Sequence, residues 1–260
     1  MERVVRIFAW MIFVFLYIPI IALIVYSFNA SPVSYRWDGL TLNWYAELFA
    51  DERLLATLRT SLIVAILAAA LATMLGFLSA YAVARLRVRG ARLFLGALLI
   101  PLIVPEIVLG VALLTVFSTL NVPAGLLTLV LGHTVVTLPL ATLVMLGAMS
   151  ALDPSLPEAA SDLGASAWGT FRRVTLPLLR PSLLAAYLLS FATSFANIVI
   201  STFTSGVGTT TLPLRIYSEL RTGLTPELNA LGTLLVASTL VIIALVGVGQ
   251  LRRILAGPRP

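Results

Sequence analysis

Long apolar runs alternate with short polar segments along this chain. A helix needs about 20 mainly apolar residues to cross the hydrocarbon core of a membrane. Six runs reach that length, and charged residues, glycine or proline separate each from the next. The pattern therefore predicts an all-α polytopic membrane protein with six transmembrane helices. The expected spans are Phe8–Phe28, Ser61–Val83, Phe94–Ser118, Leu126–Met149, Leu183–Phe203 and Leu231–Leu251.

The composition agrees with this class. Hydrophobic residues make up 60% of the chain and charged residues 11%, whereas a soluble domain has about 25% charged residues. Arg3 and Arg6 before the first run are also typical of a signal peptide, but the run exceeds an apolar signal segment of about 7–15 residues. We interpret it as an uncleaved span. Cysteine is absent from the sequence, which excludes disulfides and thiolate metal sites.

The placement of arginine predicts the orientation. Every basic side chain other than the single histidine is arginine, and 12 of the 17 fall on one side of a six-span arrangement. Cytoplasmic loops carry the excess of positive charge in membrane proteins. Both termini and the polar segment 153–181 are therefore expected in the cytoplasm. The arginines on that side are Arg3, Arg6, Arg85, Arg87, Arg89, Arg92, Arg172, Arg173, Arg180, Arg252, Arg253 and Arg259.

Two longer segments are expected outside. Ser31–Leu54 contains Trp37, Trp44, Tyr45 and Phe49, which suits either an interfacial helix or a simple belt of aromatic rings at headgroup level. In the second segment, glycine and proline breaks flank a possible short helix over Leu214–Leu220.

The stretch Glu158–Pro181 is unusually polar for a position between two spans. Ser155 and Glu158 have the spacing of a capping box, which predicts the start of a short helix. Gly164 can adopt a positive φ and is expected to end it. Ser166 is expected to cap a second short helix that ends before Pro177. The segment would form a compact projection on which small alanines allow another backbone to approach.

These residues resemble the EAA loop of binding-protein-dependent ABC importer permeases. The matching positions are Glu158-Ala159-Ala160, Gly164-Ala165, Phe171, Val174, Leu176-Pro177 and Pro181. Four further segments are similar to the spermidine/putrescine-type permeases of that family: Tyr26–Asn29, Leu40–Phe49, Pro101–Val108 and Leu212–Thr233. The resemblance covers nearly the whole chain and implies the permease fold of a type I ABC importer. It implies residues 1–56 as a first helix with an external interfacial segment, and 57–255 as a five-helix core with a coupling loop at 153–181.

The resemblance also implies function and partners. The chain would be a transport subunit without catalytic chemistry, in the bacterial inner membrane and surrounded by lipid. It would work with a second homologous permease subunit, a cytoplasmic ATPase dimer and an extracytoplasmic substrate-binding protein, and with no nucleic acid. ATP and Mg would bind to the ATPase, since a P-loop needs a lysine and this sequence has none. The implied ATPase-coupling residues are Glu158, Ala159, Ala160, Asp162, Leu163, Gly164, Ala165, Phe171 and Arg172.

Polar residues within the spans are candidates for a substrate pathway. Glu106 lies near the middle of the third predicted span, where a charged group needs a polar partner or water. Pro101 and Pro105 are expected to kink that helix. His133 in the fourth span is either a pH-sensitive gate or a neutral histidine between helices. The fifth span has a polar stripe at helical spacing, which suits a water-filled path or simple helix packing: Ser190, Ser194, Asn197, Ser201 and Thr204.

The sequence leaves the solute open. Polyamine-type relatives usually have acidic residues where this chain has Ala196 and Asn197, and a polycation needs carboxylates to offset its desolvation. Other amines, iron complexes, phosphonates and small organic anions stay possible. An ATP-independent secondary transporter with Glu106 as its proton or ion site is the alternative, but it predicts internal repeats and no clear repeat is present. An intramembrane enzyme would have only Glu106 and His133 to work with.

Overall fold

The computed structural model describes residues 2–32, 36–85, 89–222 and 226–255. Those residues are helical except for loops and one isolated β-bridge between Asn29 and Leu40, so the predicted all-α class is confirmed. The helices are α1 (Glu2–Tyr26), α2 (Asn43–Ala50), α3 (Glu52–Arg85), α4 (Ala91–Ile103), α5 (Glu106–Thr119), α6 (Leu126–Ala151), α7 (Ser155–Asp162), α8 (Ala167–Thr170), the π-helix η1 (Phe171–Thr175), α9 (Leu176–Phe195), α10 (Val199–Thr204), α11 (Leu212–Thr222) and α12 (Pro226–Leu255).

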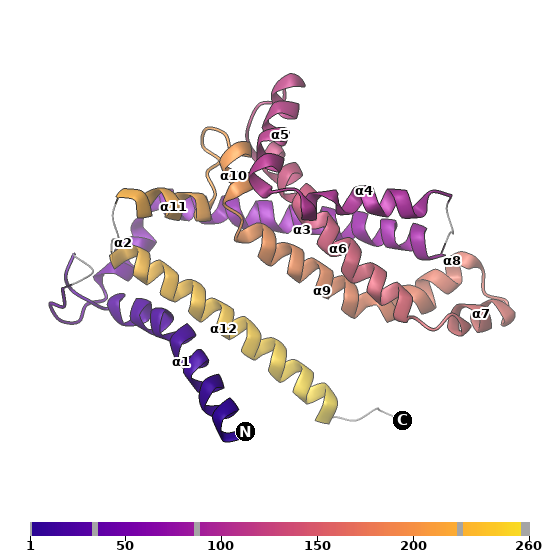
Figure 1. Cartoon of the computed structure of the whole chain (residues 1–260), viewed down its shortest axis with the longest axis horizontal. Helices are drawn as coiled ribbons and strands as arrows, with labels where there is room; N and C mark the ends of the chain where they lie inside the picture. The colour runs from indigo at the N-terminus through magenta and orange to yellow at the C-terminus, as the bar shows by residue number, and fades with distance from the viewer. Residues whose placement is uncertain (1, 33–35, 86–88, 223–225, 256–260) are drawn as a thin grey trace. The chain divides into compact units, whose positions relative to one another are not determined.

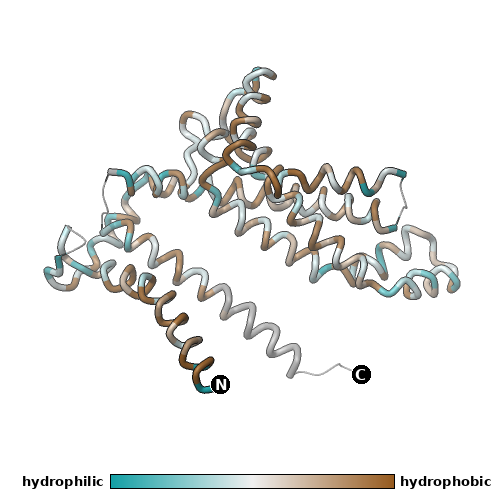
Figure 2. Tube along the Cα trace, in the orientation of Figure 1, coloured by the Kyte–Doolittle hydropathy of each residue, from teal (hydrophilic) through white to brown (hydrophobic). Residues whose placement is uncertain are grey.

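The chain folds as two compact units, of which one comprises residues 1–55 and 218–260. In this unit α1 lies beside α12 (Figure 1). Their close approach depends on Gly232, because a Cβ there would lie 2.9 Å from Leu23 Cδ1. Helix α1 buries no residue within the chain and is apolar along most of its length (Figure 2). It is therefore built to face lipid or another membrane helix.

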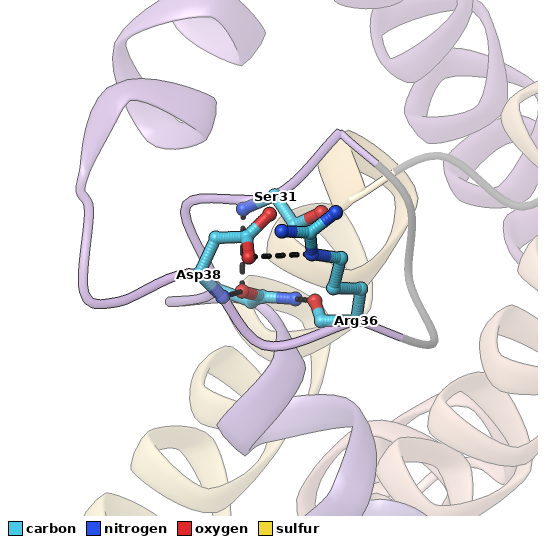
Figure 3. A network of polar contacts seen from close by, with 4 residues as sticks. Ser31, Arg36 and Asp38 are labelled. Carbon is cyan, nitrogen blue, oxygen red and sulfur yellow. Dashed lines mark hydrogen bonds and ion pairs between the residues drawn. The ribbon is translucent and has the colours of Figure 1, made fainter.

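The loop before α2 belongs to the same unit, and side-chain hydrogen bonds fix its conformation. Buried Asn29 accepts the backbone N–H groups of Ser31 (3.2 Å) and Asp38 (3.0 Å) through its Oδ1 atom. Trp44 Nε1 donates to the Asn29 carbonyl at 2.7 Å. Arg36 pairs with Asp38 at 2.9 Å, with Ser31 close by (Figure 3). Within Ser31–Leu54, helix before Glu52 is confined to Asn43–Ala50, and the half-buried Trp44 ring is bonded back to the loop.

The second unit, Ala56–Tyr217, contains both candidate sites. Helix α6 packs against α9 and α4, and α3 runs beside them (Figure 1). Close contact between α3 and α6 is possible because a Cβ on Gly76 would lie 2.8 Å from the Thr142 backbone nitrogen. Small residues dominate the core that these helices share, as expected where membrane helices associate by close packing. That core consists of Ala72, Ala80, Ala141, Met145, Met149, Leu179 and Ala186.

Two of the predicted spans are broken. The third is split into α4 and α5, which meet at 108°. The fifth is interrupted at residues 196–198, between α9 and α10. The short helices α5 and α10 pack on each other, with Phe203 against Gly110, where a side chain would collide with the ring. The break at Pro105 agrees with the kink expected there, whereas Pro101 lies inside α4. A continuous helix through the fifth span was the wrong expectation.

Among the described residues, four helices are long and apolar enough to cross a membrane: α1, α3, α6 and the run from α8 through α9. The α4–α5 pair makes a fifth if it is counted as one span. The sixth predicted span, Leu231–Leu251, falls on α12, whose described side chains form an apolar segment only over Pro226–Val241. The rest of that span lies outside the described side chains.

Candidate functional site

The two helix breaks meet at Glu106 and Asn197. Pro105 precedes the first residue of α5, Glu106, and its ring cannot continue the hydrogen-bond ladder of α4. Asn197 lies in the break between α9 and α10, and its Oδ1 accepts the Ile200 N–H at 2.8 Å. This bond caps the first turn of α10. The Asn197 carboxamide then donates its Nδ2 hydrogen to Glu106 Oε1.

His133 links the same break to α6. Its side chain is 2% exposed, and its two ring nitrogens contact serines on opposite sides of the break. Nδ1 lies 2.8 Å from Ser194 Oγ at the end of α9, and Nε2 lies 3.0 Å from Ser201 Oγ in α10. Ser201 Oγ is also 2.9 Å from the Asn197 carbonyl, to which it donates. A single hydrogen-bonded network therefore joins His133 to Glu106.

Glu106 and Asn197 line an open hollow of about 680 Å³ in the second unit. Its walls are mostly aliphatic, with Thr193 as a further polar side chain. Glu106 is the only charged residue among its described lining residues. The lining residues are Pro101, Leu102, Val104, Glu106, Val136, Leu140, Thr193, Ala196, Asn197, Ile198 and Val199. Such a site can offer a solute one carboxylate, one carboxamide and apolar contacts.

The structure brings together the five residues that the sequence proposed for a pathway, but in two different settings. Glu106 and Asn197 are half-buried and reach the hollow, whereas His133, Ser194 and Ser201 are buried between helices. Four residues of the polar stripe, Ser190, Ser194, Ser201 and Thr204, are thus buried within the chain, and Asn197 reaches the hollow. Glu106 begins a helix and does not lie within one, because Pro105 ends the ladder before it. Sequence reasoning missed Thr193, which lies one residue from Ser194.

The loop at 153–181 begins with α7, whose first turn has a different cap from the predicted one. Asp153 Oδ1 accepts the Ser155 N–H at 2.9 Å, and the N-cap position is Pro154, so Ser155 is already the first residue of the helix. This backbone bond, with a smaller contribution from the Ser155 hydroxyl, lowers the pKa of exposed Asp153 below its ordinary value. The capping box of Ser155 and Glu158 was therefore wrong, because a carboxylate two residues earlier is the stronger acceptor.

Gly164 ends α7 as the sequence predicts. Its φ is +83°, and two bonds close the turn. The Gly164 N–H donates to the Ser161 carbonyl at 2.9 Å and the Ala165 N–H to the Ala160 carbonyl at 3.0 Å. This pair of bonds is a Schellman motif, which needs a residue in the left-handed region. The turn directs the chain from α7 into α8.

The second helix of the loop is longer than expected. Ser166 caps it as predicted, with its Oγ accepting the Gly169 N–H at 3.1 Å. The chain then passes through the π-helix η1 into α9 without stopping before Pro177. A π-turn has wider rings than an α-helix, and we attribute the tolerance of Pro177, which has no N–H, to this wider turn just before it.

The loop exposes apolar side chains while it is anchored from behind. Leu163 is 89% exposed and Trp168 is 68% exposed. Trp168 stacks on Phe171 with ring centroids 5.4 Å apart, and Phe171 contacts Tyr81 of α3 at 5.8 Å. The remaining loop positions proposed for coupling are at least partly accessible: Glu158, Ala159, Ala160, Asp162, Gly164, Ala165 and Arg172. The loop thus projects an exposed apolar tip, and aromatic contacts connect it to α3.

Apolar helices, broken spans around a hollow and a projecting helical loop together define a membrane transport permease. The profile of the binding-protein-dependent transport system inner membrane component matches residues 72–255. The chain belongs to that family.

Two curated relatives share much of the sequence. The spermidine/putrescine transport system permease protein PotC of Haemophilus influenzae is 39% identical, over 92% of this chain and 93% of its own. The putrescine transport system permease protein PotI of Escherichia coli is 37% identical, over 87% and 83%. A solved bacterial ABC transporter involved in import of the acidic polysaccharide alginate aligns with a TM-score of 0.72 at 16% identity, covering 96% of this chain and 95% of that one. That likeness concerns the fold.

Proposed function

We propose that this chain is a permease subunit of an ATP-driven importer and forms half of a pore for a polyamine-like organic cation. Relatives named as spermidine/putrescine and putrescine permeases, similar over most of their length, support the solute class. The proposed assembly contains a second homologous permease subunit, a cytoplasmic ATPase dimer that binds ATP and Mg, and an extracytoplasmic substrate-binding protein. The complex lies in the bacterial inner membrane with both termini of this chain in the cytoplasm.

The observation that carries the solute class is the charge of the hollow. Glu106 is its one ionisable lining residue within the described chain, and aliphatic side chains make up most of the remainder. A carboxylate offsets part of the desolvation of an ammonium group, and the apolar wall suits the methylene chain of a linear amine. An anion would meet Glu106 without a compensating arginine among these lining residues. Asn197 in place of an acidic residue implies fewer fixed charges than a strongly polycation-selective site would have.

The loop 153–181 is the proposed coupling element. Its apolar tip, Leu163 and Trp168, is exposed although it faces the aqueous side in the proposed orientation. Contacts of Phe171 with Tyr81 and Phe77 connect the loop to α3. A groove on an ATPase subunit could receive the tip, and a displacement of the tip would then reach α3 and α9 directly.

The test combines purification with uptake. The complex is purified through a tag on this chain, and proteoliposomes loaded with ATP are supplied with the binding protein and labelled putrescine or spermidine outside. Co-purification of an ATPase and ATP-dependent amine uptake are expected. Uptake that proceeds without ATP would favour the secondary transporter, and uptake of anions in place of amines would overturn the solute class.

A further inference from the structure

We propose that His133 is a positioning residue that braces the break in the fifth span and so presents Asn197 to Glu106 in the substrate hollow. The inference rests on the proposed function of the hollow. It adds a role for a buried side chain that does not itself line the hollow.

The brace follows from the positions of its two partners. Ser194 precedes the break at residues 196–198 and Ser201 follows it, and one imidazole bonds both. Backbone bonds alone hold a break loosely, since a helix end leaves carbonyl and N–H groups without partners. Two side-chain bonds from a neighbouring helix fix the distance between the end of α9 and the start of α10. Thr128 of α6 makes a second bond to α10, since its hydroxyl donates to the carbonyl of Thr204, the last residue of α10, at 2.7 Å.

The donors and acceptors run in one direction. Ser201 has a single hydroxyl hydrogen and donates it to the Asn197 carbonyl, so its oxygen accepts from His133 Nε2–H. His133 Nδ1 lies against the Ser194 hydroxyl, so each ring nitrogen has a serine partner. Asn197 in turn donates its Nδ2–H to Glu106. Hydrogen bonds that follow one another in such a chain polarise and strengthen one another.

The consequence is that removing the imidazole should act on Asn197 and not only on stability. Leucine at position 133 fills a comparable volume but bonds neither serine. Ser201 and Asn197 would then be free to shift, and the Asn197–Glu106 bond would lose its fixed geometry. Glutamine can restore donor and acceptor functions at the same place.

The first readout is local and independent of any solute. The sequence has no cysteine, so a single introduced thiol reports without background. Ile200→Cys places it in the first turn of α10, where the native side chain is fully buried. His133→Leu should raise its rate of thiol labelling at least several-fold, while His133→Gln should raise it less. Met145→Cys, equally buried in α6 but remote from the break, should label slowly in every background.

The second readout is uptake by the reconstituted complex. His133→Leu should lower the uptake rate about tenfold, the equivalent of one hydrogen bond to a charged group, and His133→Gln should recover most of it. In an Asn197→Ala background His133→Leu should cause no further loss. Thr142→Val removes another buried hydroxyl of α6, whose bond is to its own helix, and should leave uptake unchanged.

Unchanged labelling of the Ile200→Cys thiol on adding His133→Leu would overturn the brace. An equal loss of uptake with and without Asn197 would overturn the positioning role. A wild-type complex that takes up no amine would contradict the proposed function instead, and the labelling experiment would still decide the brace.

Discussion

The carboxamide of Asn197 donates a hydrogen bond to the carboxylate of Glu106, which lies 91 positions earlier in the chain. The bond joins two interrupted spans at the wall of one hollow. It explains how a carboxylate is accommodated at the start of an apolar helix, since its charge meets both a polar donor and the positive end of α5. Substitutions that change the charge of this pair are therefore the most direct test of which solute is transported.

Replacing Glu106 by glutamine should reduce amine uptake about tenfold while the complex still assembles. Glutamine keeps an oxygen that can accept from Asn197, so the fold is preserved, but the hollow loses its negative charge. Uptake rates and the yield of co-purified ATPase measure the two effects separately. Thr115→Val in α5 is the matched control, because the Thr115 hydroxyl bonds its own helix at Val111 and the residue does not line the hollow. Uptake unaffected by Glu106→Gln would show that the residue is structural.

Replacing Asn197 by aspartate should shift preference toward the more highly charged amine. The change removes the donor to Glu106 and adds a second carboxylate, while an oxygen remains to cap α10. Two carboxylates in contact share a proton until a cation binds, so the second charge develops only with an amine in the hollow. One extra charge interaction across water is worth about 1 kcal/mol at 4 Å, and the ratio of spermidine to putrescine uptake should therefore rise about fivefold. Competition between the two labelled amines measures this ratio. An unaltered ratio would remove Asn197 from the list of selectivity residues.

Gly164→Val should uncouple the loop without affecting membrane insertion. Nothing lies within 4 Å of a Cβ at this position, so the cost arises from φ +83° alone, about 1–2 kcal/mol for a residue with a side chain. Gly164→Asn is the matched control, because asparagine tolerates the left-handed region better than valine. ATPase recovery and uptake should fall in the valine variant and largely survive in the asparagine variant. Equal behaviour of the two would mean that the turn is not needed for coupling.

Asp153→Ala should loosen the first turn of α7, whereas Ser155→Ala should not. The structure assigns the cap to Asp153, whose bonds lower its pKa below the ordinary value. A carboxyl with a lowered folded pKa stabilises above its unfolded pKa and loses this contribution as pH falls through the lowered value. The cap should therefore be constant at neutral pH and fail only in strongly acidic solution. Hydrogen exchange of the Ser155 amide measures the strength of the cap. Faster exchange in Ser155→Ala alone would support the capping box of Ser155 and Glu158 instead.

Reporter fusions check the orientation and the broken span together. Fusions after Arg89 and Arg173 should report the cytoplasm, and fusions after Asn121 and Gly206 should report the outside. The asymmetry of arginine motivates the assignment. A cytoplasmic signal after Asn121 would mean that α4 and α5 enter and leave the membrane on the same side, which the 108° bend also allows.

Local features of this chain could be predicted because their causes are local. The apolar runs favour helices on their own composition, Gly164 is suited to a left-handed turn, and Ser166 can cap only the residues that follow it. The candidate pathway residues were identifiable for a similar reason, since a polar group in an apolar span is conspicuous.

Features that depend on a choice between partners could not be predicted. Asp153 and Ser155 were both able to cap α7, and only the folded backbone selects between them. The break at residues 196–198 contains neither proline nor glycine, and it depends on an Asn197 side chain that bonds α10 and Glu106. The pairing of His133 with one serine of α9 and one of α10 has no signal in the spacing of the chain.

The 108° bend between α4 and α5 bears on how the protein enters the bilayer. Insertion depends on the summed apolarity of a segment, which is the same for a straight helix and a broken one. Pro105 breaks the helix locally, but the groups that contact α5, Asn197 and Phe203, lie in a segment that is synthesised only after α4 and α5. The packing of α5 against that segment must therefore be completed late, once the fifth span has arrived. The walls of the hollow are thus completed only after a later segment of the chain has been synthesised. A chain truncated before α10 should insert into the membrane without forming the hollow.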